Sequence, residues 1–352
     1  MPSTNSDQTP GGTRQRPLLA LTVGDPAGIG PEIAVRAATE PEVSSRARTL
    51  IVGDASVVDR AARLYQLDVK VNVTTDPHDV AGRADTLDVY DIGVAHADDI
   101  AVGQVSELAG RSAIASIESA TRLAMEGRVD AVVTAPINKE AIWATGSEHL
   151  GHTEMLQALT GARESTTMFV VRGLKIFFTT RHTALRQALD QIDVDRVTGA
   201  IGSALTALRV FGHDRPRLAV AAINPHGGEG GNFGREEIDV LTPAVDASQA
   251  PDAEVTGPIP ADSVFHQGVQ GRYDGVLSHY HDQGHIAAKT LDFNGTVSVT
   301  TGLPILRTSV DHGTAFDIAG AGQASHQTMV AATLAAADFA QYLDRIRATY
   351  TP

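Results

Sequence analysis

The stretch LLALTVGDPAGIGPEIAVRAAT, residues 18–39, decides the fold. It begins with an apolar run, Leu18–Val23, that is typical of a buried strand. A glycine-containing loop follows, and Pro31 then takes the first position of an expected helix, Pro31–Thr39, where its missing N–H costs nothing. A strand that leads through a loop into a helix is the repeating unit of α/β proteins.

The same alternation continues along the rest of the chain. Further strands are expected at Arg48–Gly53, Asp130–Pro136, Ile176–Thr180, Arg217–Asn224, Asp274–Ser278 and Thr296–Thr300, and further helices at Ser56–Leu67, Val105–Gly127 and Gln327–Tyr350. This order predicts an α/β fold with largely parallel strands. The sequence contains no internal repeat and no long linker, so a second domain would be interleaved with the first.

Composition limits the classes of function. The 352 residues include 28 Lys and Arg against 42 Asp and Glu, a formal net charge of −14, which disfavours nucleic-acid binding. There is no cysteine, which excludes disulfides, thiolate nucleophiles and Cys-based metal sites. No apolar run reaches the ~18 residues of a membrane span. Residues 1–16 are polar and are expected to form a disordered leader, so we expect a cytoplasmic protein that does not bind membranes.

The loop Gly24–Glu32 lies between the first strand and the first helix. Its glycines would let a ligand approach the backbone near the positive end of that helix. The loop is not a dinucleotide fingerprint, because the third glycine of G-x-G-x-x-G is absent, and it is not a P-loop, because no Gly-Lys-Ser/Thr follows. A tight structural turn is the alternative interpretation.

Three histidines follow three expected strands. His182 comes after Ile176–Thr180, His226 lies in NPHGGEGG, and His281 lies in SHYHDQGH. Loops at the carboxyl ends of parallel strands carry function in α/β folds, so the three side chains could share a cleft. Three neutral imidazoles would bind a divalent metal and leave positions open for substrate. Each histidine alone could equally be structural, and their spacing is no recognised zinc motif.

Several cationic and hydrogen-bonding segments could bind an anion, and most of them lie near the end of the chain. Lys289 and the segment Arg307-Thr308-Ser309 suit a phosphate or a carboxylate, and the segment GHTE, residues 151–154, could add donors at a helix start. A solvated lysine and a surface ion pair are the alternatives. The segment 311–320, DHGTAFDIAG, could hold a flat ring or could be a structural connector.

Together these motifs resemble the family of 4-hydroxythreonine-4-phosphate dehydrogenases, the PdxA family. The segments GDPAGIGPE, TAPINK, GHTE, INPHGGEGG, GPIPAD, SHYHDQG and GLPILRTSVDHGTAFDIAG occur in family order over nearly the whole chain. GIGPE and HGTAFDIAG also look like segments of isopropylmalate and isocitrate dehydrogenases. The resemblance implies their fold, two α/β subdomains with a cleft between them, which binds NAD without the Rossmann glycines.

The resemblance also implies a homodimer with a shared active site. It implies one divalent metal (Zn, Mg or Co) on His182, His226 and His281, with ligands from both subunits. Residues matching family positions that contact the phosphorylated substrate are His152, Thr153, Lys289 and Arg307, with Ser298 at a related position. The cofactor, NAD or NADP, is expected against the loop that carries His312, Gly313, Thr314 and Asp317.

The resemblance leaves the substrate open. Ser298 stands where the vitamin B6 enzymes usually have Asn, and His285-Ile286 stands where they usually have Leu-Pro. HDQGHI is more similar to the branch that oxidises 4-phospho-D-threonate and 4-phospho-D-erythronate at C3, giving a 3-keto acid that loses CO2. The alternatives are pyridoxal phosphate synthesis, a cis-dihydrodiol dehydrogenase and a non-catalytic sugar-phosphate binding protein.

The general base and the domain bounds are predicted less specifically than the metal ligands. Asp282, Lys139 and Asp262 are the candidate bases, and Asp282 is better suited to orient a metal ligand. We expect residues 17–140 and 285–352 to form the first α/β subdomain. Residues 141–284 would form the second, with the metal ligands and the dimer interface.

Overall fold

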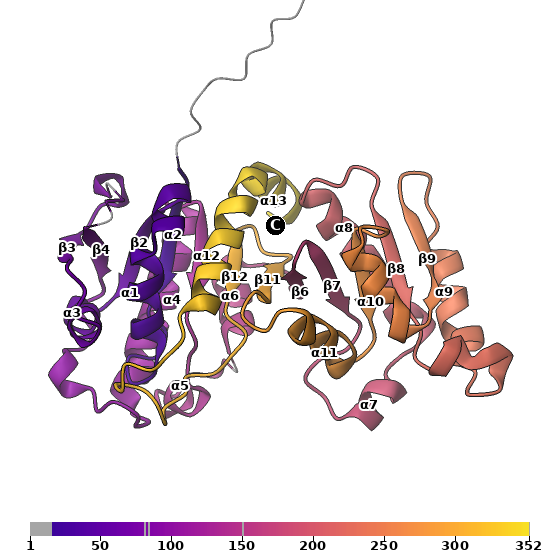
Figure 1. Ribbon diagram of the computed structural model, residues 1–352, viewed down its shortest axis with the longest axis horizontal. Helices are drawn as coiled ribbons and strands as arrows, with labels where there is room; N and C mark the ends of the chain where they lie inside the picture. Colours follow the sequence, from indigo (N-terminus) through magenta and orange to yellow (C-terminus); the bar gives the residue numbers. More distant parts are fainter. Residues whose placement is uncertain (1–15, 81, 84, 150, 352) are drawn as a thin grey trace, which may run out of the picture.

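The computed structural model describes residues 16–80, 82–83, 85–149 and 151–351, and one continuous twelve-stranded sheet runs through it (Figure 1). From one edge to the other the strands are β3 (Lys70–Thr74), β4 (Thr86–Asp91), β2 (Arg48–Gly53), β1 (Leu18–Thr22), β5 (Ala131–Thr134), β12 (Arg307–Ser309), β11 (Val297–Thr301), β6 (Thr166–Val171), β7 (Leu174–Phe178), β10 (Gly275–Ser278), β8 (Arg217–Ala221) and β9 (Glu254–Ile259). The leader expected over residues 1–16 lies outside the described residues except for Arg16.

The sheet consists of two parallel runs that point in opposite directions. The first run is β3-β4-β2-β1-β5-β12, and the second is β7-β10-β8-β9. Between them β11 pairs antiparallel with both β12 and β6, and β6 pairs antiparallel with β7. The expected α/β fold with largely parallel strands is confirmed, and the two halves meet at the antiparallel strands in the middle.

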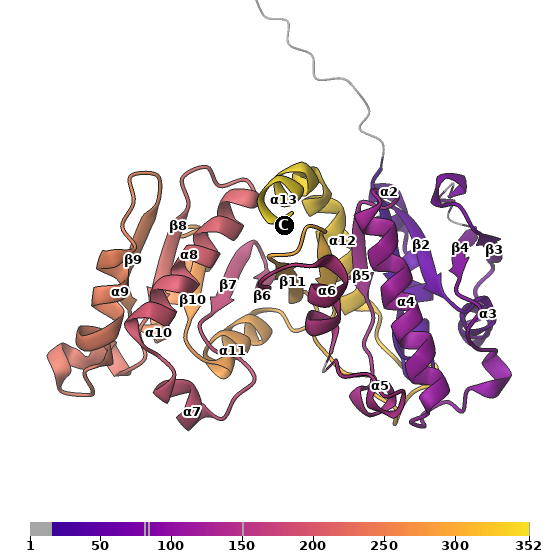
Figure 2. The same cartoon turned by 180° about the vertical axis from the view of Figure 1, so that it is seen from behind.

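Helices cover both faces of each half (Figures 1 and 2). Those of the first half are α1 (Gly30–Thr39), α2 (Pro41–Arg46), α3 (Ala55–Leu64), α4 (Glu107–Met125), α5 (Lys139–Ala144), α6 (His152–Thr160) and α12 (Gln327–Phe339), and the last helix, α13 (Leu343–Tyr350), packs against the second half. Those of the second half are α7 (Leu185–Asp190), α8 (Val194–Val210), α9 (Thr242–Ala247), α10 (Ala261–Val269) and α11 (His281–Leu291). Helices α4 and α12 pack on opposite faces of the first half, and α8 and α11 do the same in the second.

The expected elements agree with the structure in position, with one clear exception. The strand at Arg48–Gly53 is found with the bounds expected for it. The single closing helix expected over Gln327–Tyr350 is wrong, because a short 3₁₀ turn, Ala340–Tyr342, separates α12 from α13. No helix in the described part of the chain is both long and apolar enough to cross a lipid bilayer.

The division into subdomains remains a proposal. The expected boundary between residues 284 and 285 falls inside α11, which packs as one helix against β6, β7 and β10 of the second half. Helix α12 packs against β5, β12 and α1 of the first half. We therefore place the return of the chain to the first half between α11 and β12.

Candidate functional site

A cavity of about 260 Å³ lies on one face of the central strands, where the two halves meet. Alternate residues of β6, β11 and β12 point to this face, and α5, α6 and α11 contribute from above it. Its lining consists of Lys139, Gly151, His152, Thr153, Glu154, Thr167, Phe169, Arg181, His182, His285, Ser298, Arg307, Ser309, Val310 and Asp311. Four of the five expected substrate-binding residues line this cavity: His152, Thr153, Ser298 and Arg307.

Arg307 lies at the floor of this cavity and is buried, with 5% of the residue exposed. It donates to the hydroxyl oxygens of Thr134, at 3.1 Å from Nε, and Thr300, at 2.9 Å from Nη1. No carboxylate of the described residues pairs with it. Burial lowers the pKa of Arg307 to about 9, so the side chain is still cationic at neutral pH. A buried cation without a counter-ion in its own chain favours an anionic ligand.

His152 adds to this anion site from the first turn of α6. Its Nε2 is closed off from solvent and has no hydrogen-bond partner among the residues that the structure describes. Burial, and then the charge of Arg307, hold the pKa of His152 well below its usual range. The first hydrogen bond of the helix runs from Met155 N to Gly151 O, which leaves the earlier N–H groups free to bind an anion. One cavity therefore brings together an arginine, an imidazole and a helix start, groups whose chemistry suits a phosphate or a carboxylate.

His182 and His281 come together beside this site. They follow β7 and β10, which are neighbours in the sheet, and their ring centroids lie 5.8 Å apart. Desolvation, followed by repulsion from Arg181, lowers the pKa of His182, which favours the neutral imidazole that a metal requires. Asp282 Oδ1 lies 2.7 Å from His281 Nδ1, so the carboxylate orients this ring as expected of it and leaves Nε2 free.

His226 does not join the pair within this chain. No group of three or more His, Asp or Glu side chains that could hold a metal occurs among the residues described. His226 follows β8, which is the direct neighbour of β10 and lies two strands from β7, so the strand order alone does not separate it from His281. It lies in the segment Pro225–Gly231, where five successive residues from His226 to Gly230 have positive φ, and its side chain is exposed.

Two of the expected catalytic groups lie away from the cavity floor. Asp262 is exposed in the first turn of α10, which packs against the His226 segment, and it does not line the cavity. Lys139 lines the cavity from its exposed rim. The identity of the general base therefore stays a prediction.

Lys289 lies next to the cavity rather than in it. Its Nζ is 2.6 Å from Asp311 Oδ2, and it lines a neighbouring hollow of about 460 Å³ together with His182, His281 and His285. A ligand that spans both hollows would reach it.

The expected cofactor loop packs against the glycine loop of the first strand–helix unit. Ile29 N donates to Thr314 O at 3.0 Å, and a Cβ at Gly28 would lie 2.9 Å from that oxygen, so Gly28 is required by close packing. His312 Nε2 is held by the Thr328 hydroxyl at 2.8 Å, and Asp317 is exposed. A cavity of about 360 Å³ between the two loops is lined by Gly28, Glu32, Arg60 and Gly320, among others.

Sequence reasoning missed two residues of the site as functional groups. Arg181 lines the cavity and donates to the Thr167 hydroxyl. His285 is buried between Phe169, Phe178 and His281, and burial is the main cause that lowers its pKa to about 4. Arg181 directly precedes His182, and His285 lies in the HDQGHI segment. The sequence alone does not show which side chains of these segments point into a cavity.

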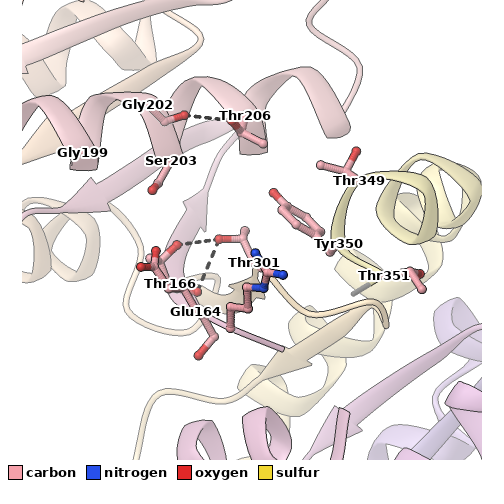
Figure 3. A pocket seen from close by; sticks show the side chains of 13 residues that line it. Glu164, Thr166, Gly199, Gly202, Ser203, Thr206, Thr301, Thr349, Tyr350 and Thr351 are labelled. Carbon is pink, nitrogen blue, oxygen red and sulfur yellow. Dashed lines mark hydrogen bonds between the residues drawn. The ribbon is translucent and has the colours of Figure 1, made fainter. Parts of the chain in front are cut away.

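A larger cavity of about 750 Å³ lies on the opposite face of the central strands, beneath α8 and α13 (Figure 3). The side chains of Thr301, Thr166 and Tyr350 lie around it, and the Thr166 and Thr301 hydroxyls are 2.7 Å apart. None of the expected site residues lines this cavity.

Comparison with known proteins finds similarity over almost the whole chain. A protein of Cutibacterium acnes, provisionally named a D-threonate 4-phosphate dehydrogenase, is 58% identical over 96% of this chain and 97% of its own. A Symbiobacterium thermophilum protein with the same provisional name is 48% identical over 94% and 99%. The crystal structure of 4-hydroxythreonine-4-phosphate dehydrogenase from Klebsiella pneumoniae superposes with a TM-score of 0.86 at 40% identity, covering 94% of this chain and all of that one.

These relatives are named dehydrogenases, and the cavity between the two α/β halves carries cations and imidazoles. The chain is therefore an NAD(P)-dependent dehydrogenase. Residues 45–336 match the family model of the pyridoxal phosphate biosynthetic protein PdxA. The chain belongs to the PdxA family, and the resemblance read from its motifs is confirmed.

Proposed function

We propose that the protein oxidises the C3 hydroxyl of a 4-phosphorylated four-carbon acid, 4-phospho-D-threonate or 4-phospho-D-erythronate, with NAD or NADP as the oxidant. The observation that carries this proposal is the unpaired, buried Arg307 beside the unpartnered Nε2 of His152. These groups match a phosphate ester, and the relatives from C. acnes and S. thermophilum bear the name of such an activity.

His182 and His281 are the residues of this chain that would hold a divalent metal. Their ring centroids lie 5.8 Å apart, and the contact of Asp282 with His281 Nδ1 leaves the Nε2 of His281 available. Because His226 lies elsewhere, we propose that it completes the site of a second copy of the chain in a homodimer with shared active sites. A metal bound there would supply Lewis acidity that lowers the pKa of the substrate hydroxyl.

The protein's own residues position the substrate for hydride transfer. Arg307, His152 and the start of α6 would bind the phosphate, far from the reacting carbon, and this binding contributes orientation. Ser298, on β11 opposite Ser309, lines the same cavity as Arg307 and would set how deep the phosphate end sits. The nicotinamide accepts the hydride from C3, and we place the adenine side of the cofactor near the cavity between Gly28 and Gly320.

The product of the oxidation is a 3-keto acid. Its carboxylate is β to the new carbonyl, so we propose that C1 leaves as CO2 and a three-carbon phosphorylated ketone remains. Lys139, at the cavity rim, and Asp262, if it is presented by the second subunit, are the candidates to exchange protons with solvent.

The second candidate is the oxidation of 4-phosphohydroxy-L-threonine for pyridoxal phosphate synthesis. It is favoured by the family model and by the name of the K. pneumoniae structure. Its substrate carries an ammonium group at C2, next to the site of His182. Lys139, at the rim of the cavity, disfavours such a group, because like charges repel strongly in a partly dehydrated cavity.

The proposal is tested by NADH or NADPH formation. Purified protein is assayed with 4-phospho-D-threonate, with and without a chelator, and after the metal is added back. We expect turnover that the chelator abolishes and the metal restores, and release of CO2 in equal amount to the reduced cofactor. Turnover unaffected by the chelator contradicts the metal, reduced cofactor without CO2 contradicts the decarboxylation, and binding without turnover indicates a non-catalytic protein.

A further inference from the structure

Two arginines that line the cavity donate hydrogen bonds to two threonines that lie opposite each other on neighbouring strands. Thr167 on β6 pairs with Thr300 on β11, so their side chains lie on the same face of the sheet, about 5 Å apart at Cβ. The Thr167 hydroxyl accepts from Arg181, and the Thr300 hydroxyl accepts from Arg307 at 2.9 Å. Two guanidinium groups are therefore anchored side by side at the cavity floor.

Neither arginine is neutralised by the chain itself. No carboxylate of the described residues forms an ion pair with Arg181 or Arg307. Glu154 lines the same cavity but forms no ion pair with Arg181 among the described residues. Two cations in one cavity, neither in an ion pair, are unfavourable unless anions bind there.

The two cations have different neighbours. Arg307 lies near His152 and the start of α6, the set that suits a phosphate. Arg181 directly precedes His182, and its charge is felt by that imidazole, so it lies on the side where the reacting carbons would bind. One anionic group could neutralise only one of these positions.

We propose that the site binds two anionic groups of one ligand, with Arg307 and His152 binding its phosphate and Arg181 binding its carboxylate. This inference rests on the proposed function for the nature of the ligand. It makes Arg181 a substrate-binding residue that selects phosphorylated acids over phosphorylated alcohols.

The test compares two non-reacting ligands that differ only in the carboxylate. Calorimetry at fixed ionic strength measures the affinity of the full-length protein for 4-(phosphonooxy)butanoate and for butyl phosphate. We expect the wild-type protein to bind the acid at least tenfold more tightly. In Arg181→Gln this ratio should fall to about two or less, while the affinity for butyl phosphate changes by less than threefold.

Three further variants separate the explanations. Arg186→Gln removes the same charge from the exposed face of α7, outside the cavity, and should keep the wild-type ratio. Arg307→Gln should weaken both ligands more than tenfold and leave the ratio in place. Arg181→Lys, which retains the charge, should restore part of the ratio, and its melting temperature shows whether Arg181 variants fold.

Each remaining outcome contradicts a specific statement. A wild-type ratio retained in Arg181→Gln overturns the inference but leaves the proposed function intact. Loss of butyl phosphate binding in Arg181→Gln overturns it also, because the arginine would then bind the phosphate. If the wild-type protein binds neither ligand, the phosphate site itself is wrong and the proposed function fails with the inference.

Discussion

The imidazole ring of His285 stacks on that of His281, with ring centroids 3.5 Å apart and planes only 11° apart. Residues four apart lie on the same side of a helix, so the HDQGH sequence at the start of α11 places the two rings one above the other. His285 Nδ1 also bonds to His281 O at 2.8 Å. The stack and Asp282 together fix the orientation of a proposed metal ligand.

We expect His285→Ala to weaken metal binding about 10- to 100-fold, the usual effect of removing a group that orients a ligand. His285→Phe retains a flat ring and should keep most of the affinity. The measurement is metal titration by calorimetry. Equal losses in the two variants would mean that the hydrogen bond of His285, rather than stacking, orients His281.

Complementation between subunits tests the position of His226. A mixture of His226→Ala and His281→Ala chains should recover activity, because a mixed dimer would have one site with all three imidazoles. A mixture of His182→Ala and His281→Ala should recover none, since these two ligands belong to the same chain. Mixed dimers are isolated with two affinity tags before the assay. Recovery in the second mixture and not in the first would reverse the assignment.

Truncation of Arg307 should weaken transition-state binding. Arg307→Ala is expected to cost about 2–4 kcal/mol in kcat/KM, because charge-assisted hydrogen bonds each contribute ~1.5–3 kcal/mol and the loss leaves buried hydroxyls unpaired. Arg307→Lys keeps the positive charge but loses the planar guanidinium, so its kcat/KM should lie between those of the wild type and Arg307→Ala. Steady-state kinetics with the phosphorylated substrate provides the measurement, and a loss below threefold would remove Arg307 from the phosphate site.

Asp25 should make stability depend on pH. Burial is the main cause that raises its pKa to about 6, and its Oδ2 is buried without a partner. The folded state therefore holds this proton more tightly than the unfolded chain. The stabilising contribution is complete below about pH 4 and is lost as the pH rises through about 6, by up to about 3 kcal/mol.

Asp25→Asn removes the ionisable group and should remove this loss. Urea unfolding at pH 4.5, 6 and 7.5 should show that the variant gains free energy of unfolding relative to the wild type as the pH rises. Asp246→Asn, at an exposed carboxylate, is the control. A difference between Asp25→Asn and wild type that stays constant with pH would show that Asp25 is ionised throughout.

The parts of the fold that depend on local pattern could be predicted from the sequence. The run from Leu18 to Thr39 folds as expected, because a buried strand, a glycine loop and a proline-started helix each have a local signature. The antiparallel centre could not be predicted. The pairing of β11 with β6 joins residues more than 100 positions apart, such as Thr167 with Thr300, and no local pattern in the sequence marks it.

The candidate site shows the same limit. Arg307 and His152 were expected to bind an anion, and the structure places them in one cavity. His182 and His281 were expected together and lie together, because β7 and β10 are neighbours. Arg181 was missed, since only the hydrogen bond to Thr167 shows that its side chain points inward. His226 would need a second chain, which one sequence does not describe.

The substrate is the central claim, and one comparison tests it most directly. The measurement is kcat/KM for 4-phospho-D-threonate, 4-phospho-D-erythronate and 4-phosphohydroxy-L-threonine under one set of conditions. We expect one of the two hydroxy acids to be preferred over the amino acid by at least tenfold, because Lys139 repels an ammonium group at C2. A clear preference for 4-phosphohydroxy-L-threonine would contradict the account and assign the protein to pyridoxal phosphate synthesis.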